Sequence, residues 1–285
     1  TLTEKTASKG YDLSTSVVNI DFADEQTISL VGKGCLIETP KNDPIGLEIV
    51  KNDSKTLEVP QGDATLEGAQ FTVKYYNGFY AKNNLPSTPT RTWILQTKER
   101  DGKYRAGLSN TYKVSGDEFY YDENNQPILP LGTITIKETK APVGYLLEGV
   151  KLNVTDTSTG KISTVTDEKY VALITEQYQG AKLQFGNDAN QMIVQEKVKK
   201  QRIQLFKSGE REGISGVVKG LQGAEFTWKL KSEVDNVGWN NAKTYSVITT
   251  NENGRAITDY LPYGKYLVRE TKTPKDYMTA PDFTV

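Results

Sequence analysis

The sequence contains no histidine, a single cysteine and no long hydrophobic run. Histidine is the commonest general base and metal ligand, so its absence excludes histidine-based triads and argues against a metal site. The single cysteine, Cys35, can form no internal disulfide, and we interpret it as a small buried residue in a strand. Because no run of about 18 apolar residues occurs, we expect no membrane insertion in this segment.

Neither sign of charge is in excess, because the formal net charge is −1 over 285 residues. Nucleic-acid-binding domains have a basic footprint, so we expect no nucleic-acid partner. The length is sufficient for two domains with hydrophobic cores of their own and part of a third. Neither a signal peptide nor a C-terminal anchor is recognisable, and for a secreted protein we expect both to have been removed.

The most informative feature present is a glutamate that recurs seven residues before a tyrosine. The two fuller copies read Glu-Thr-Lys-x-Pro-x-x-Tyr, which we call the box, and a looser copy opens the chain. The three pairs are Glu4 with Tyr11, Glu138 with Tyr145, and Glu270 with Tyr277. An acidic residue repeated in one local frame indicates either a repeated structural corner or repeated chemistry.

Two further elements precede each fuller box in the same order. A strand-like run ends at Lys51 in one copy and at Lys207 in the other. A Leu-x-Gly-Ala-x-Phe block follows at residues 66–71 and again at 221–226. Turn residues separate short β-branched and aromatic runs along the whole chain, with no convincing helix longer than two turns. The sequence therefore predicts an all-β protein made of tandem β-sandwich repeats.

The repeats divide the chain into three parts. Residues 1–43 are expected to be the C-terminal remnant of a preceding repeat, which we call the leading segment. Residues 44–200 are expected to form a complete repeat, and residues 201–285 a second repeat that lacks its closing strand. The two blocks are 155 residues apart and the two boxes 132 apart, so the first full repeat contains an insertion of about two dozen residues. We expect this insertion within residues 75–88 and 114–126.

The lysine, the block and the box together resemble the collagen-adhesin B-type repeats of Gram-positive surface adhesins and pilins. The resemblance covers nearly the whole chain and implies an Ig-like, prealbumin-like β-sandwich for each repeat. In that family a lysine of the first strand joins an Asn or Asp side chain of the last strand in an isopeptide bond. The box glutamate is the proton shuttle. The resemblance also implies an extracellular location on the bacterial cell surface, with cell-wall anchoring in the full-length protein.

For the first full repeat, the resemblance implies Lys51 as the nucleophile and Glu138 as the acid/base. The acceptor should lie in the closing strand, where Asn190 is the first choice and Asn187 the second. Glu196 is a third choice, because a carboxylate is a poor acceptor unless it is protonated. A plain buried ion pair that locks two strands is the alternative to a covalent bond.

The other two copies are expected to be incomplete. Lys207 and Glu270 match the pattern, but the acceptor for Lys207 is absent from this chain and is expected beyond Val285. Glu4 has lost its lysine, and the acceptor position of the leading segment falls near Glu38, which is neither Asn nor Asp.

The chemistry has a physical basis that does not depend on the family. An ammonium group is not a nucleophile, and burial in an apolar core favours its neutral form. Burial likewise favours the protonated form of a carboxylic acid. A neutral amine and a protonated acid can therefore coexist in one core, where the acid polarises an amide carbonyl and passes protons to the departing ammonia.

We therefore expect a structural stalk or adhesion module whose partners are neighbouring repeats of the same protein. It needs no cofactor, and its only catalysis is a single self-crosslinking event. An alternative function is a ligand-binding module, in which Tyr75, Tyr76 and Tyr80 contact a glycan or a host protein. An enzyme acting on external substrates is disfavoured, because histidine, a Gly-x-Ser-x-Gly elbow and a metal cluster are all lacking. Residues 27–38 of one chain are further expected to complete the open last repeat of another by strand addition.

Overall fold

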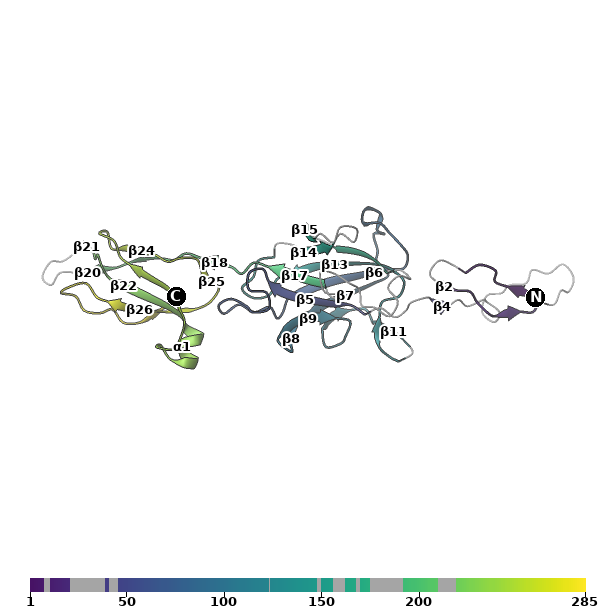
Figure 1. The fold of residues 1–285 in the computed structure, drawn as a ribbon, viewed down its shortest axis with the longest axis horizontal. Helices are drawn as coiled ribbons and strands as arrows, with labels where there is room; N and C mark the ends of the chain where they lie inside the picture. Colours follow the sequence, from purple (N-terminus) through teal and green to yellow (C-terminus); the bar gives the residue numbers. More distant parts are fainter. Residues whose placement is uncertain are drawn as a thin grey trace. The chain divides into compact units, whose positions relative to one another are not determined.

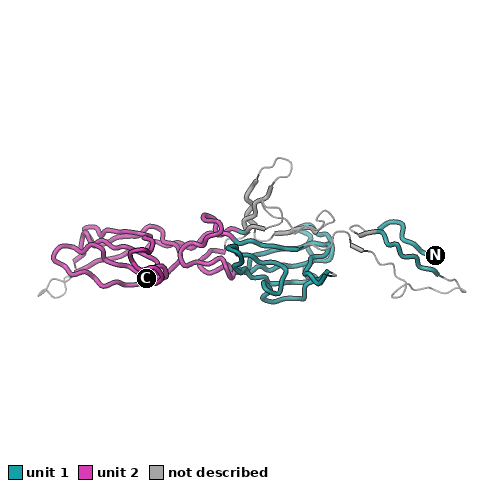
Figure 2. The backbone as a smooth tube through the Cα atoms, turned by 60° about the horizontal axis from the view of Figure 1, so that its bottom comes forward, with its two compact units in different colours: residues 1–51, 69–140, 149–194 teal, residues 52–68, 141–148, 195–285 magenta. Residues whose placement is uncertain are grey.

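The computed structural model of the chain describes residues 1–7, 11–20, 39–40, 46–122, 124–147, 150–155, 162–167, 170–174, 192–209 and 219–285. These residues are almost entirely β-strand and turn, so the predicted all-β class is confirmed (Figure 1). The chain divides into two compact units, which are coloured separately in Figure 2. Unit 1 comprises residues 1–51, 69–140 and 149–194, and unit 2 comprises residues 52–68, 141–148 and 195–285.

Unit 1 contains two main sheets. The five-stranded sheet has the order β10-β7-β6-β13-β16 and the four-stranded sheet has the order β17-β5-β9-β8. The five strands of the first sheet are β6 (Gln70–Tyr76), β7 (Arg91–Gln96), β10 (Lys113–Gly116), β13 (Gly132–Lys140) and β16 (Tyr170–Ile174). The four of the second are β5 (Glu48–Asp53), β8 (Lys98–Arg100), β9 (Lys103–Gly107) and β17 (Met192–Glu196), of which β5 and β17 each continue by two residues into unit 2.

Shorter strand pairs complete unit 1. They are β1 (Leu2–Thr3) with β3 (Val17–Val18), β2 (Tyr11–Asp12) with β4 (Thr39–Pro40), β11 (Tyr120–Tyr121) with β12 (Pro127–Ile128), and β14 (Val150–Thr155) with β15 (Ile162–Asp167). A 3-10 turn, η1 (Lys82–Asn84), lies between β6 and β7.

One apolar core joins the inner faces of the two main sheets of unit 1. Side chains alternate between the two faces of a strand, so every second residue of the central strands points inwards. Ile49 of β5 and Val194 of β17 are fully buried on one side of the core. Phe71, Trp93 and Ile136 are fully buried on the other. This arrangement is a β-sandwich, as the sequence predicts.

The insertion of the first full repeat lies in only one of the two expected places. The β6–β7 connection in unit 1 spans residues 77–90, and the equivalent connection in unit 2 spans residues 231–243. Because these two connections have nearly equal lengths, residues 75–88 contain no insertion. The difference lies between β9 and β13, where unit 1 has β10, β11 and β12. Of the two stretches expected to hold the insertion, residues 114–126 therefore lie within it.

Unit 2 contains a four-stranded sheet with the order β23-β22-β26-β27. Its strands are β22 (Glu225–Leu230), β23 (Thr244–Thr249), β26 (Tyr266–Lys272) and β27 (Phe283–Thr284), and the helix α1 (Lys231–Val237) follows β22. Three further pairs are β18 (Lys200–Gln201) with β25 (Leu261–Pro262), β19 (Gln204–Phe206) with β24 (Arg255–Ile257), and β20 (Ser208–Gly209) with β21 (Lys219–Gly220). The core of unit 2 includes Phe226, Trp228 and Val268, against which Leu205 packs while remaining partly exposed.

Two loops that the sequence assigns to the first full repeat lie in unit 2, namely residues 52–68 and 141–148. Asp63, in the first of these loops, accepts hydrogen bonds from the hydroxyl of Ser232 in α1 and from the backbone N–H of Lys265 (3.0 Å). No helix in the described part of the chain has the length and apolar composition that crossing a bilayer requires.

Candidate lysine–glutamate sites

The first candidate site is a buried ion pair in unit 1. Lys51 lies on β5 and Glu138 on β13, and the Lys51 Nζ–Glu138 Oε2 distance is 2.8 Å. Both side chains are 0% exposed. Glu138 is the register partner of Phe71, the last residue of the Leu-x-Gly-Ala-x-Phe block. The fold therefore brings together the three sequence elements that recur along the chain.

Unit 2 contains a second pair with nearly the same geometry. Lys207 follows β19, Glu270 lies on β26, and the Lys207 Nζ–Glu270 Oε2 distance is 2.9 Å. Glu270 is the register partner of Phe226, again the last residue of a block. Its Oε2 also accepts a hydrogen bond from the backbone N–H of Ala280 (2.6 Å). The Lys207 side chain, unlike that of Lys51, is 13% exposed.

The end of each box forms the same turn. The backbone N–H of Tyr145 donates to the carbonyl of Pro142, and Tyr277 donates to Pro274, both at 3.2 Å. The residue before each tyrosine has a positive φ, which is 87° in Gly144 and 67° in Asp276. Glycine adopts this left-handed region without strain, and aspartate tolerates it better than most residues.

The tyrosine of the first box has a partner that the sequence interpretation missed. The hydroxyl of Tyr145 donates to Asp53 Oδ2 at 2.8 Å, and the amide of Gln61 donates to both carboxylate oxygens of Asp53 at 2.9 Å. The backbone N–H groups of Lys55 and Thr56 donate to Asp53 Oδ1. Burial acts to raise the pKa of Asp53, but these hydrogen bonds together hold the pKa below its ordinary value. Asp53 lies two residues after Lys51, and alternate residues of a strand share one face. That spacing was the sequence signal from which the position of Asp53 beside Lys51 could have been predicted.

The acceptor is less well defined than the lysine and the glutamate. Asn187 and Asn190 lie outside the described residues, as do Cys35, Glu38 and residues 27–38. The described part of the closing strand is β17, in which Val194 and Glu196 are both buried. Glu196, the third choice from the sequence, therefore lies on the inward face of that strand.

The leading segment has a different environment for its glutamate. Glu4 Oε2 accepts a hydrogen bond from the backbone N–H of Ser14 at 2.7 Å. This contact joins the glutamate of the opening copy to a residue of the same segment.

The tyrosines proposed as a ligand face do not form one. Tyr75 and Tyr76 are buried, and the hydroxyl of Tyr75 donates to the carbonyl of Leu131 at 2.7 Å. Tyr80 is half-buried, and its ring contacts Tyr76 edge to face. The expectation of a ligand face is therefore wrong for Tyr75 and Tyr76, because the alternation of β6 and the packing around its end place both rings inside unit 1.

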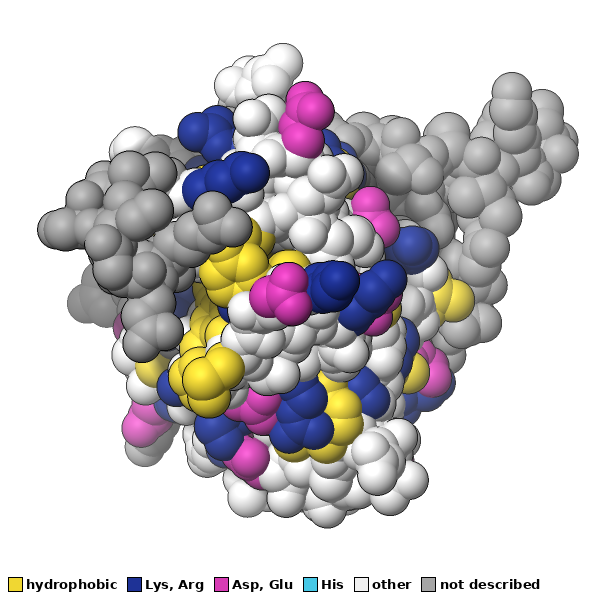
Figure 3. All heavy atoms as spheres, turned by 90° about the vertical axis from the view of Figure 1, so that its left-hand side faces the viewer, with side chains coloured by type: hydrophobic (Ala, Val, Ile, Leu, Met, Phe, Trp, Pro, Cys, Tyr) yellow, Lys and Arg dark blue, Asp and Glu magenta, His cyan; other side chains and the backbone are white. Residues whose placement is uncertain are grey.

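The acidic loops that the structure describes give no sign of a metal site. Within the described ranges, no group of three or more Cys, Asp or Glu residues is placed to hold a metal ion. Asp117 accepts a hydrogen bond from the backbone N–H of Thr92 on β7, and Asp122 accepts backbone hydrogen bonds from Asn124 and Gln126 in its own loop. On the face shown in Figure 3, positive and negative side chains are interspersed with small hydrophobic patches. That face therefore has no extended region of one charge.

Comparisons with known proteins agree with this fold. Residues 215–285 match the family described as SpaA: Prealbumin-like fold domain. No curated protein matches the chain. Among solved structures, the Bacillus anthracis TIE protein is similar over 99% of this chain and 38% of its own, with 23% identity and a TM-score of 0.50. The chain thus spans well under half of that protein.

Two further solved structures are pilus proteins with lower scores. GBS52, the minor pilin of Streptococcus agalactiae, is similar over 85% of this chain and 89% of its own, with 14% identity and a TM-score of 0.27. A C-terminal fragment of the pilus adhesin SpaC from Lactobacillus rhamnosus GG is similar over 85% and 81%, with 16% identity and a TM-score of 0.36. The family match at residues 215–285 confirms the prealbumin-like fold that the resemblance implies.

Proposed function

We propose that the chain is a structural module of a Gram-positive cell-surface adhesin or pilin-like stalk, which separates domains and resists mechanical load. The observation that supports this proposal most strongly is the Lys51–Glu138 pair, which is fully buried between two strands with Nζ and Oε2 2.8 Å apart. Burying two charges is costly, and replacing such a pair by apolar residues is often neutral or stabilising. A second pair in the second repeat has nearly the same geometry. Repetition of a costly arrangement favours a chemical role for it over simple stabilisation.

The chemistry that this arrangement supports is a single crosslinking step. Transfer of a proton from the Lys51 ammonium to Glu138 leaves a neutral amine beside a protonated acid. The amine nitrogen attacks the side-chain carbonyl carbon of an asparagine in the closing strand, with Asn190 as first choice and Asn187 as second. The new C–N bond forms, the carboxamide C–N bond breaks, and the nitrogen leaves as ammonia with the protons that the acid relays. No oxidant, metal or cofactor is needed.

Such a bond suits a molecule that is pulled at its ends. It connects the first and last strands of the repeat, so tension passes through the bond and bypasses the rest of the sandwich. By analogy with a disulfide that closes a loop of this length, the bond contributes about 5 kcal/mol through the lost entropy of the unfolded chain. A chain with a single cysteine has no internal disulfide to do the same.

The mass of the folded chain tests the proposal. Condensation of Lys51 with an asparagine removes ammonia, about 17 Da, whereas condensation with Glu196 removes water, about 18 Da. We expect the loss of ammonia, and peptide mapping of the crosslinked pair identifies the acceptor. Lys51→Ala should restore the full mass, while Lys207→Ala, the matched control, should keep the deficit.

Three results would count against the crosslink. An unmodified mass in the folded chain would leave a plain ion pair that locks β5 to β13. A loss of water would move the acceptor to a carboxylate. A deficit that survives Lys51→Ala would move the bond to another lysine.

A further inference from the structure

The main sheet of unit 2 has an uncovered edge at β23. In that sheet β23 is the outermost strand and pairs only with β22 among the described residues. Thr250, directly after β23, donates its N–H to the carbonyl of Ala224 and accepts from the N–H of Gly223, both at 2.9 Å. Because the backbone groups of an antiparallel strand alternate in direction, those of Val247 and Thr249 point away from β22. We call this outward side of β23 the open edge.

The equivalent edge of unit 1 is covered by a strand. Thr97 and Thr250 follow β7 and β23, and each donates its N–H to the alanine carbonyl of its own block at 2.9 Å, so β7 corresponds to β23. The outer side of β7 pairs with β10. The N–H of Gln96, at the position of Thr249, donates to the carbonyl of Tyr112 at 2.8 Å. The comparison indicates that an antiparallel strand is what this edge accepts.

The covering strand is part of the insertion that unit 2 lacks. The connection between β9 and β13 spans residues 108–131 and contains β10. The corresponding connection between β24 and β26 spans residues 258–265, all of which the structure describes. It contains β25, which pairs with β18 and not with β23. The open edge therefore results from an internal difference between the two repeats.

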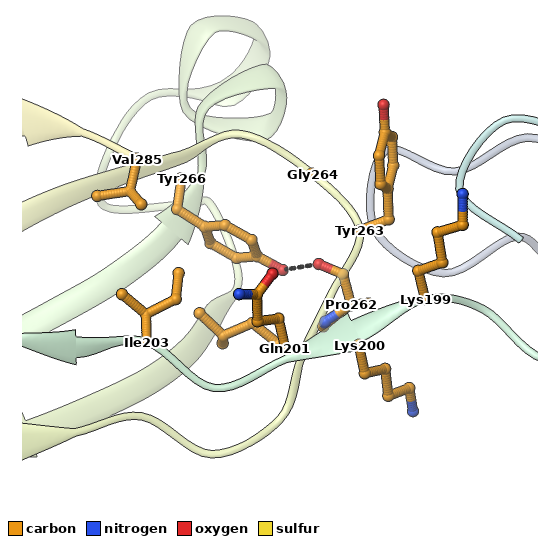
Figure 4. Close-up of a pocket in the computed structure, with 10 residues that line it drawn as sticks. Lys199, Lys200, Gln201, Ile203, Pro262, Tyr263, Gly264, Tyr266 and Val285 are labelled. Carbon is orange, nitrogen blue, oxygen red and sulfur yellow. Dashed lines mark hydrogen bonds between the residues drawn. The ribbon is translucent and has the colours of Figure 1, made fainter.

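A hollow of about 280 Å³ lies beside the open edge. It is lined by β23, β24 and the residues next to them, and the side chains of Val247 and Ile257 at its border are 53% and 48% exposed. A larger hollow of unit 2, about 450 Å³, is shown in Figure 4, where the hydroxyl of Tyr266 donates to the carbonyl of Pro262. No residue that lines the larger hollow belongs to β23 or β24. The open edge is thus a separate surface.

The sequence of β23 does not protect this edge. Exposed edge strands usually carry charges, proline or bulges that prevent pairing with other chains. The six residues of β23, Thr-Tyr-Ser-Val-Ile-Thr, include no charge and no proline. The irregular register between β22 and β23 lies at the start of β23, before Ser246, so Val247 and Thr249 are in its regular part. Such a strand can pair with a copy of itself without burying a charge.

A two-fold arrangement about Val247 satisfies the outward backbone groups of both copies. In this antiparallel register Val247 of one copy lies opposite Val247 of the other, as in any isologous interface. Lys243 and Glu252, both exposed, flank β23 at its two ends. The antiparallel register brings Lys243 of each copy to the end of the strand where the other copy has Glu252. A parallel register would place like charges side by side, so charge favours the antiparallel one.

We propose that the open edge is a self-association site through which two copies of this chain join their unit 2 sheets by pairing β23 with β23. The occupant is a second copy, because the strand is uncharged and its flanking charges are complementary to those of its own two-fold mate. Pairing of one short strand buries much less than the roughly 1,200 Å² of a stable interface. The association is therefore weak in free solution and strengthens where copies are held close together.

A charge-swap experiment tests the register. Sedimentation equilibrium of the full chain from about 10 μM to about 1 mM should give a Kd of about 0.1–1 mM. Val247→Glu and Val247→Lys each place like charges directly opposite at the two-fold axis, so each should weaken association at least about fivefold. An equimolar mixture of the two variants pairs opposite charges and should recover the association of the parent. That recovery is specific to a two-fold register centred on residue 247.

Phe206→Glu is the matched control. Phe206 is 54% exposed on β19 and Val247 is 53% exposed on β23, so the same charge is introduced at equally exposed positions of two different strands. Phe206→Glu should leave the association unchanged. Both positions are at the surface, so both variants should keep the circular dichroism spectrum of the parent.

Amide hydrogen exchange reports the edge directly. In the dilute chain the N–H groups of Val247 and Thr249 should exchange fast, whereas that of Ile248, which points to β22, should be protected. At about 1 mM chain the exchange of Val247 and Thr249 should slow at least about twofold. Gln96, whose N–H is bonded to Tyr112, is the internal control and should be protected equally at both concentrations.

Several results would overturn the self-association site. A strict monomer at about 1 mM would do so, as would slow exchange of Val247 and Thr249 in the dilute chain, because another segment would then cover the edge. Association that survives both Val247 variants, that their mixture does not recover, or that Phe206→Glu abolishes would exclude the proposed register. The mass deficit of the crosslink depends on Lys51 and should persist in every one of these variants, so failure of one proposal is distinguishable from failure of the other.

Discussion

The two lysine–glutamate pairs differ in burial rather than in geometry. Their Nζ–Oε2 distances are 2.8 Å for Lys51–Glu138 and 2.9 Å for Lys207–Glu270. Each glutamate lies opposite the phenylalanine of its block. Yet Lys51 is fully buried, whereas Lys207 is partly exposed beside an open groove. The shared fold of the two repeats therefore sets the distance between lysine and glutamate, whereas the groove beside Lys207 accounts for its greater exposure to water.

The largest expected difference between the repeats comes from removing each lysine. Lys51→Ala leaves the Glu138 carboxylate buried without its cation, and breaking a buried pair in this way costs about 3–5 kcal/mol. Lys207→Ala should cost clearly less, because water reaches that site and Glu270 also accepts from Ala280. Hydrogen exchange of β6 and β22 in urea reports the two repeats separately. The double variant Lys51→Met/Glu138→Leu also removes the unpaired carboxylate, so it should recover that part of the loss but not the contribution of the proposed crosslink. Equal losses at the two lysines would contradict the comparison.

A second difference lies in the box tyrosine. Tyr145 donates to the buried Asp53, whereas no equivalent contact of Tyr277 with a carboxylate is seen in the described residues. Asp53→Ala should destabilise the molecule by about 2–3 kcal/mol, since it removes the acceptor of several hydrogen bonds. Tyr277→Phe should change stability by less than about 0.5 kcal/mol. Denaturant titration of each variant against the parent measures both.

The same carboxylate gives a pH dependence with a definite sign. The pKa of Asp53 is lowered in the folded chain, so its contribution is fully present above the unfolded value of about 3.9. The contribution is lost as the pH falls through the lower folded pKa. The stability difference between the parent and Asp53→Asn should therefore be constant at neutral pH and shrink below about pH 4. Asp101→Asn, at an exposed turn, is the control, and a difference that grows on acidification would contradict the assignment.

A smaller difference separates the two core tryptophans. Trp93 Nε1 donates to the carbonyl of Glu118 at 3.2 Å, whereas Trp228 Nε1 has no partner in the described structure. Tryptophan to phenylalanine removes the same atoms at both positions, so the difference between the two variants isolates the hydrogen bond. We expect Trp93→Phe to cost about 1 kcal/mol more than Trp228→Phe. Thermal unfolding followed by circular dichroism is sufficient, and a larger loss at Trp228 would show that its indole is satisfied in solution.

The smallest expected effect concerns two surface ion pairs. Arg105–Glu48 in unit 1 and Arg269–Asp282 in unit 2 have N–O distances of 2.8 and 2.7 Å. The second pair is the more exposed, so Asp282→Asn should cost no more than about 0.5 kcal/mol and nothing at high salt. Glu48→Gln should cost somewhat more, and its effect should persist in salt. Unfolding at low and high ionic strength compares the two, and equal salt sensitivity would contradict the expected difference.

Much of the fold was predictable because repetition supplies information that single residues lack. Short β-branched and aromatic runs between turns predicted the all-β fold, and the family resemblance carried by the lysines, blocks and boxes implied the pairing of Lys51 with Glu138. The opening strands were expected to end at Lys51 and Lys207, and they run over Glu48–Asp53 and Gln204–Phe206. Strand ends are the least certain part of such predictions, because turns and neighbouring strands decide where pairing stops.

Other features were not predictable from local pattern. Tyr75 and Tyr76 lie next to each other in a polar, aromatic stretch that reads as an exposed face. Both are buried instead. Tyr75 follows the inward alternation of β6, and packing around the end of the strand covers the ring of Tyr76, which alternation alone would leave outside. Asp53 was missed because its four donors come from a turn, a loop and the box tyrosine, which meet only in the folded chain.

The sequence by itself located each lysine, block and box at a repeated position, and the family resemblance that these motifs carry implied which residues form the two lysine–glutamate pairs. Only the tertiary structure decided that one pair is closed and the other borders a groove. Side-chain identity sets which groups can react or pair. Burial depends on which strand lies alongside, and that is a property of how distant segments pack.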